Sequence, residues 1–94
     1  MEAVVRAQAV FRGNVQGVGF RYTTRHLASA FGVTGYVENE PDGSVEVVAE
    51  GTREHVAGLI DSVREQMADY IRTCDIEWGA AQGKFDGFRV RFGW

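Results

Sequence analysis

The spacing of apolar residues changes along this chain from every second residue to every third or fourth residue and back again, twice. Alternation is typical of strands with one buried face, and spacings of three and four are typical of amphipathic helices. The pattern predicts strands over 5–11, 34–40, 44–50, 74–78 and 88–92. It predicts helices over 20–31 and 52–68. The order is therefore strand, helix, strand, strand, helix, strand and a final strand.

This order predicts an α+β fold of the ferredoxin-like type, a split βαβ sandwich (βαββαβ) followed by a C-terminal strand. Two helices would cover one face of a mostly antiparallel sheet. A chain of 94 residues can bury one two-layer core, so residues 1–94 are expected to form a single domain. Many unrelated activities share this fold, so function must come from particular residues.

Turn and capping residues support these boundaries. Pro41-Asp42-Gly43 separates the two middle strands, and it predicts an antiparallel hairpin because proline fixes φ and glycine permits positive φ. Gly32 is suited to end the first helix, and Thr52 is suited to cap the start of the second.

The composition excludes several classes of protein. Cys74 is the only cysteine, so neither an intramolecular disulfide nor a cysteine-rich zinc site is possible, and an inert buried thiol is expected. The net charge is −3 and the ten basic residues are scattered, so nucleic acid is not an expected partner. No long apolar run or export signal is visible, so we expect a cytoplasmic protein with no membrane partner.

A glycine-rich segment joins the first strand to the first helix. Gly13, Gly17 and Gly19 fall within seven residues, and Phe20-Arg21 follows at once. Such a loop can gather backbone N–H groups around an anion, and Arg21 in the first helical turn adds a planar, permanently charged fork. The competing interpretation is a flexible connection with a surface arginine, which glycine content alone favours.

Common phosphate-binding motifs are absent from this segment. A nucleotide P-loop needs lysine after its last glycine, but neither Gly17 nor Gly19 precedes one, and Tyr22 replaces the last glycine of the dinucleotide fingerprint. A cysteine phosphatase would place its cysteine six residues before the arginine, where this chain has Val15. The sequence therefore supports neither nucleotide binding nor a covalent phosphoryl-enzyme.

Other chemistry-bearing residues fit structural roles. His26 and His55 fall on different predicted helices without metal-ligand spacing. Glu46 and Glu50 are expected to point outward from a strand. No catalytic carboxylate pair and no metal site are expected.

Two segments resemble the signatures of the acylphosphatase family. The first is Gly13-Asn14-Val15-Gln16-Gly17-Val18-Gly19-Phe20-Arg21, and the second is Gly35-Tyr36-Val37-Glu38-Asn39, followed by Gly43, Val45 and Gly51. The similarity extends over the whole chain in length, element order and the closing strand 88–92. One departure is Glu38, where the family usually has a basic or neutral residue. Alternation places Glu38 on the strand face opposite Asn39, so its charge is expected to act through space.

The resemblance implies a metal-free hydrolase without cofactors that cleaves acyl phosphates into a carboxylate and inorganic phosphate. Arg21 matches the family's phosphate-binding arginine and Asn39 its water-orienting asparagine, so these two are the expected catalytic residues. The expected phosphate-binding residues are Val15, Gln16, Gly17, Val18, Gly19, Phe20 and Arg21. The expected partners are a small acyl phosphate and inorganic phosphate as product and inhibitor, and the expected state is a monomer.

Two alternatives remain. A non-catalytic module that binds phosphate or carbamoyl phosphate is one, because acylphosphatase-like domains also occur attached to larger maturation enzymes; the 94-residue length disfavours it. An RNA-binding ferredoxin-like domain would need exposed aromatic residues in a basic motif, which the last strand lacks.

Overall fold

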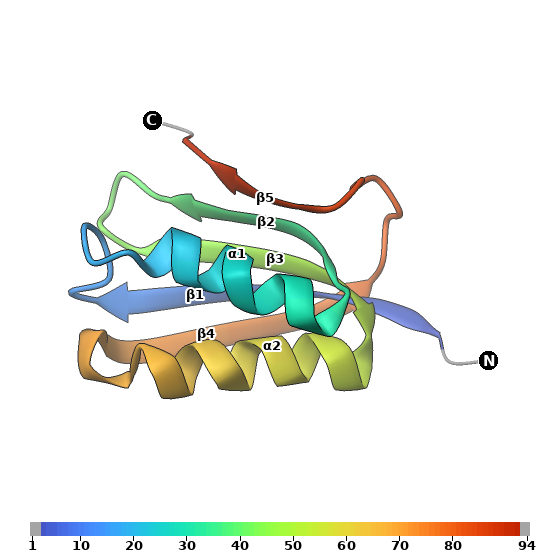
Figure 1. Ribbon diagram of the computed structural model, residues 1–94, viewed down its shortest axis with the longest axis horizontal. Helices are drawn as coiled ribbons and strands as arrows, with labels where there is room; N and C mark the ends of the chain where they lie inside the picture. Colours follow the sequence, from blue (N-terminus) through green and yellow to red (C-terminus); the bar gives the residue numbers. More distant parts are fainter. Residues whose placement is uncertain (1–2, 93–94) are drawn as a thin grey trace.

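Five strands form one sheet, and two helices cover one of its faces (Figure 1). The computed structural model describes residues 3–92. The elements in chain order are β1 (Val4–Gly13), α1 (Phe20–Phe31), β2 (Thr34–Asn39), β3 (Val45–Thr52), α2 (Arg53–Gln66), the 3-10 turn η1 (Ala68–Tyr70), β4 (Ile71–Ala80) and β5 (Phe88–Arg91). This order confirms the predicted α+β ferredoxin-like fold with an added C-terminal strand.

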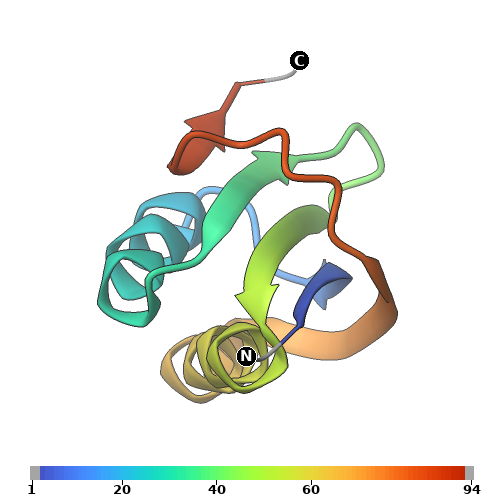
Figure 2. The ribbon, with the colours of Figure 1, turned by 90° about the vertical axis from the view of Figure 1, so that its right-hand side faces the viewer.

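Antiparallel pairing dominates the sheet, whose strand order is β4-β1-β3-β2-β5. β3 pairs antiparallel with β1 and β2, and β1 also pairs antiparallel with β4. β5 pairs parallel with β2, at the edge opposite β4. The chain must therefore cross the whole sheet between β4 and β5. Figure 2 shows this crossing segment on the side of the sheet away from the helices; we call residues 81–87 the strap.

The hydrophobic core lies between the sheet and the helices. Alternate residues of the two central strands face the helices, as the sequence pattern predicts, and each helix buries one apolar stripe against them. The fully buried members with the largest side chains include Phe11, Phe20, Val37, Val45, Val47, Val56, Leu59, Ile60 and Val63. Burial of each such side chain stabilises the fold by about 1.5–3 kcal/mol, so this layer fixes the helices on the sheet.

The helix ends match the predicted capping residues. The side-chain oxygen of Thr52 accepts a hydrogen bond from the backbone N–H of His55 at 3.2 Å, which satisfies one free donor at the start of α2. Gly32 ends α1 in a left-handed conformation, and its N–H donates to the carbonyl of Ala28. In the described part of the chain, no helix has both the length and the apolar character needed to cross a membrane.

Two residues depart from the expected burial. Glu50 points outward from β3, on the sheet face away from the helices, as expected, but it is only 4% exposed because the strap covers it. Cys74 is half-buried rather than fully buried. Burial raises the pKa of its thiol, so the sulfur stays protonated and unreactive near neutral pH, as expected.

Candidate active site

The loop between β1 and α1 depends on glycine for its backbone conformation. Gly17 and Gly19 have φ angles of 76° and 80°, in the left-handed region that strains residues with a Cβ atom. Added Cβ atoms at these positions would meet nothing within 4 Å, so conformation rather than space requires glycine. Gly19 caps α1 without a side-chain hydrogen bond. The first N–H groups of α1 are therefore presented to the adjoining space, as in anion sites at helix N-termini.

Side chains of the same loop anchor it to the rest of the fold. Val15 and Phe20 are buried, and the rings of Phe20 and Phe11 pack with their centroids 5.1 Å apart. The amide nitrogen of Gln16 donates hydrogen bonds to the carbonyl oxygens of Glu40 (2.8 Å) and Ser44 (2.9 Å). These contacts tie the loop to the β2–β3 turn, so its backbone amides are held in place before any ligand arrives.

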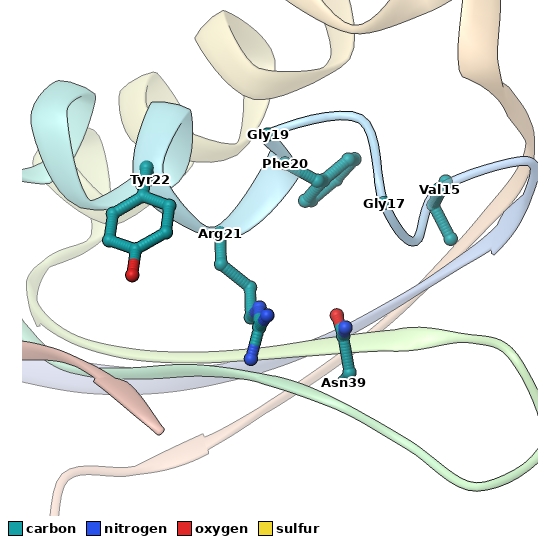
Figure 3. A pocket seen from close by; sticks show the side chains of 7 residues that line it. All are labelled: Val15, Gly17, Gly19, Phe20, Arg21, Tyr22 and Asn39. Atoms are coloured by element: carbon teal, nitrogen blue, oxygen red, sulfur yellow. The ribbon is translucent and has the colours of Figure 1, made fainter. Parts of the chain in front are cut away.

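A small cavity lies between this loop, the first turn of α1 and the end of β2 (Figure 3). Its volume is about 80 Å³. One water needs only about 10–15 Å³ on this measure, so the cavity has room for several oxygen-sized groups. It is lined by Val15, Gly17, Gly19, Phe20, Arg21, Tyr22 and Asn39.

Arg21 and Asn39 approach the cavity from different elements. Arg21 extends from α1, and Asn39 is the last residue of β2, where alternation turns it to the same face as the buried Val37. Figure 3 shows both side chains directed into the same space. The structure thus brings together the two residues that the sequence predicts to be catalytic.

The guanidinium group of Arg21 is supported by the end of β5. Its Nη1 donates to the carbonyl oxygen of Arg91 at 3.4 Å, and its carbon lies 4.7 Å from the ring centroid of Phe92, a cation–π distance. Within residues 3–92, no carboxylate lies within ion-pair distance of Arg21. Its positive charge is therefore uncompensated at the cavity.

The side-chain amide of Asn39 makes no hydrogen bond to another residue in the described range. An amide carries both a donor and an acceptor. Asn39 can therefore donate a hydrogen bond to the oxygen of a water or accept one from its O–H group. Unlike a carboxylate or an imidazole, it cannot remove a proton at neutral pH. Asn39 is therefore suited to orient a water rather than to deprotonate it.

Apart from Asn39, which was expected as a catalytic residue, the observed lining differs from the expected phosphate-binding set at three positions. Gln16 and Val18 belong to the loop but do not line the cavity, and the side chain of Gln16 is engaged with backbone carbonyls instead. Tyr22 lines the cavity although the sequence did not single it out as a site residue; it is 57% exposed at the rim. Its place in the first turn of α1, directly after Arg21, was the signal available for predicting this.

Glu38 is held on the sheet face opposite Asn39, as predicted, but it is not a free surface charge. Its side chain is only 15% exposed, and one carboxylate oxygen lies 3.4 Å from Nε of Arg91. The same guanidinium lies over the ring of Tyr36, with its carbon 4.1 Å from the centroid. Arg91 therefore offsets part of the negative charge that is expected to act on the cavity.

Three carboxylates lie close together on the side of the sheet that carries Glu38, opposite the cavity. Oxygens of Glu38, Glu40 and Glu46 lie within 4.8 Å of one another. Glu46 accepts hydrogen bonds from Tyr36 (2.8 Å) and from Gln8. Burial, together with the neighbouring carboxylates, raises the pKa of Glu40. Burial, then the bond to Glu46, raises the pKa of Tyr36 to about 12. None of these groups lines the cavity.

Comparisons with known proteins identify the family of this chain. A family model described as acylphosphatase matches residues 7–90. The chain is 46% identical over 87 residues to an acylphosphatase of Salinibacter ruber, covering 92% of each protein, and 49% identical over 91 residues to one of Acaryochloris marina, covering 96% of this chain and 97% of the relative. The crystal structure of acylphosphatase from Bacillus subtilis shares the fold, with a TM-score of 0.84, 24% identity, and coverage of 94% of this chain and 99% of the other. This chain belongs to the acylphosphatase family.

Proposed function

We propose that this protein is an acylphosphatase, which uses water to cleave the carboxyl-phosphate anhydride bond of acyl phosphates. The family match and the similarity to curated acylphosphatases support this activity. One observation carries the assignment of residues. The uncompensated guanidinium of Arg21 and the unengaged amide of Asn39 face one small cavity beside the N-terminus of α1.

Arg21 and the loop amides form the site for the phosphoryl group. The N–H groups of the glycine loop and of the first turn of α1 supply short-range donors, and Arg21 supplies a full positive charge with a planar donor fork. Charge spreads over the equatorial oxygens of the phosphoryl group as the reaction proceeds. Donors that are already in position stabilise that charge without reorganising, which is how this site lowers the barrier.

Asn39 positions the nucleophile. Its amide oxygen accepts from a water and its amide nitrogen donates to the water or to a phosphoryl oxygen, so the water's lone pair is directed at phosphorus. The water oxygen then forms a bond to phosphorus while the bond from phosphorus to the acyl oxygen breaks. The balanced reaction is R–CO–OPO₃²⁻ + H₂O → R–COO⁻ + H₂PO₄⁻, and both protons of the water stay with the phosphate.

The lining of the cavity limits the substrate to good leaving groups. It contains no histidine, cysteine, aspartate or glutamate among the described residues, and its one phenol, Tyr22, is exposed at the rim, so protonation of the departing oxygen is assigned to no side chain. A carboxylate leaves without a proton because its conjugate acid has a pKa of about 4. An alkoxide does not leave in this way, so stable phosphate monoesters are expected to be poor substrates.

The decisive experiment is release of inorganic phosphate from a simple acyl phosphate in the presence of a chelator. Turnover well above the spontaneous rate, unaffected by the chelator and competitively inhibited by phosphate, is the expected result. Tight phosphate binding without turnover would instead favour the non-catalytic binding module. Turnover that the chelator abolishes would overturn the metal-independent mechanism.

A further inference from the structure

Glu50 is a buried carboxylate that the reaction does not use. It lies on β3, on the sheet face away from the helices, and is 4% exposed. Its two oxygens accept hydrogen bonds from the backbone N–H groups of Gln82 (2.8 Å) and Gly83 (3.0 Å). Hydrogen bonds to an ionised group are stronger than neutral ones, and a buried carboxylate left without donors is costly. The two backbone amides therefore supply the donors that the buried carboxylate of Glu50 needs, and Glu50 holds these amides in place.

These two bonds hold the strap at the point where it begins to cross the sheet. Farther along, the ring of Phe85 packs edge-on against Tyr36 with centroids 5.9 Å apart, and the N–H of Gly35 donates to the carbonyl of Gly87 at 2.9 Å. Figures 1 and 2 both show the strap running from the β4 edge of the sheet to the β5 edge. Glu50 is the charged side chain at the start of this path.

The strap helps to determine where β5 lies. β5 has four residues and pairs with β2 alone, at the edge of the sheet. A short parallel edge strand has little pairing energy of its own, so its place depends on the strap that leads into it as well as on the packing of Phe88 and Val90 against the core. The last residue of β5, Arg91, and Phe92 directly after it supply the two contacts to Arg21, through the carbonyl of Arg91 and the ring of Phe92.

We propose that Glu50 is a positioning residue for Arg21, which it serves through the strap and β5 without touching the cavity. The buried carboxylate fixes the start of the strap, the strap sets the position of β5, and β5 holds one side of the guanidinium. The inference rests on the proposed role of Arg21 as the phosphate-binding arginine. The phosphate site would then have a support on the opposite face of the sheet.

The test uses graded variants of Glu50. Glu50→Met keeps a side chain of similar length but has no strong acceptor, and Glu50→Gln keeps one acceptor oxygen. The matched control is Val63→Ala, which removes buried volume from α2 and so destabilises the protein without touching the strap or β5. Competitive inhibition by inorganic phosphate and kcat/KM are measured well below the melting temperature of each variant.

Glu50→Met is expected to weaken phosphate binding roughly three- to tenfold and to lower kcat/KM by at least that factor, since a cation–π contact and a hydrogen bond to Arg21 are loosened together. Glu50→Gln should retain most of both. Val63→Ala should change neither by more than about twofold although it lowers the melting temperature. An equal loss of phosphate affinity in Val63→Ala would overturn the inference, because the effect would then reflect stability alone.

A double-mutant cycle with Phe92→Ala tests the route of the effect. If Glu50 acts through β5, the double variant should bind phosphate about as weakly as the worse single variant, because both changes remove the same support. Independent effects, which multiply, would refute the route through β5.

Hydrogen exchange gives a readout that does not require catalysis. In Glu50→Met, the amides of residues 81–91 should exchange faster while those of β1 and β3 keep their protection. Unchanged exchange in β5 would overturn this inference and leave the proposed function intact. A wild-type protein that neither binds phosphate nor turns over acyl phosphate would overturn the proposed function, whatever β5 does.

Discussion

Replacing Arg21 by lysine keeps the charge at the cavity but removes the shape that the structure supports. The carbon of the guanidinium lies 4.7 Å from the ring centroid of Phe92, its Nη1 donates to the carbonyl of Arg91, and the side chain is directed into the cavity (Figure 3). Lysine has one compact ammonium group on a flexible stem, so it cannot meet β5 and hold two phosphoryl oxygens at the same time.

The expected loss follows from these contacts. Losing one preorganised donor to a developing anion costs about 2.7–4 kcal/mol, and losing a cation–π contact at an exposed site costs about 0.5–1 kcal/mol. Together they correspond to a fall in kcat/KM of roughly 200- to 5,000-fold. The assay is phosphate release from an acyl phosphate, with circular dichroism and thermal melting to establish that the variant is folded.

Arg25→Lys provides the matched control. Arg25 lies one turn farther along α1, is exposed and does not line the cavity, so this change should leave kcat/KM within about twofold of wild type. If folded Arg21→Lys also stayed within about fivefold of wild type, Arg21 would not be the phosphate-binding residue and the mechanism would need another cation.

Three further predictions test the surroundings of the site. Asn39→Ala should lower kcat by about 10²–10³-fold while inhibition by phosphate changes less than about threefold, because Asn39 is assigned to the water; a large loss of phosphate affinity at unchanged kcat would reverse the roles. Glu38→Gln should change KM by less than about twofold because Arg91 already offsets the carboxylate, and a salt-sensitive fall in KM beyond that would show that the charge reaches the substrate. The raised pKa of Tyr36 means that folding favours its neutral phenol, so this contribution to stability is intact below pH 10 and is lost as the pH rises toward about 12. Tyr36→Phe should therefore flatten the decline in the free energy of unfolding between pH 10 and 12, measured in urea; an unchanged decline would contradict the assignment to Tyr36.

The sequence predicts most of the fold because its elements depend on local patterns. Alternation, helical spacing, Thr52 as a cap and the turn at 41–43 each act within a few residues, and all agree with the structure. The position of β5 depends on contacts between distant segments. Alternation over 88–92 predicts a strand, but it cannot say that this strand lies parallel to β2 or that its connection covers Glu50. A glutamate on the outward register of a strand is ordinarily exposed, so its burial becomes visible only once the strap is in place.

In the candidate site too, the sequence predicts features that depend on neighbouring residues but not contacts between distant segments. The glycine loop and Arg21 are adjacent in sequence, and their meeting with Asn39 was expected from the two family signatures. The engagement of Gln16 with the β2–β3 turn and the pairing of Glu38 with Arg91 join segments far apart in the chain. No spacing rule for a single helix or strand reports such contacts, so the sequence predicts the loop and the strand face of Glu38 but not the partners of these two side chains.

The pairing of β1 has a consequence for how the protein acquires activity during refolding. β1 aligns Val5 with both Gly51 and Ala80, so its two ladders close long stretches of chain. Closing such loops lowers the entropy of the chain before the new contacts can stabilise it. Domains dominated by distant strand pairing therefore fold in about milliseconds to seconds. The glycine loop begins where β1 ends, so we expect its N–H groups to take their places only when both neighbours of β1 have paired with it. Recovery of turnover after dilution from denaturant should therefore track the slow completion of the sheet rather than the earlier formation of the helices.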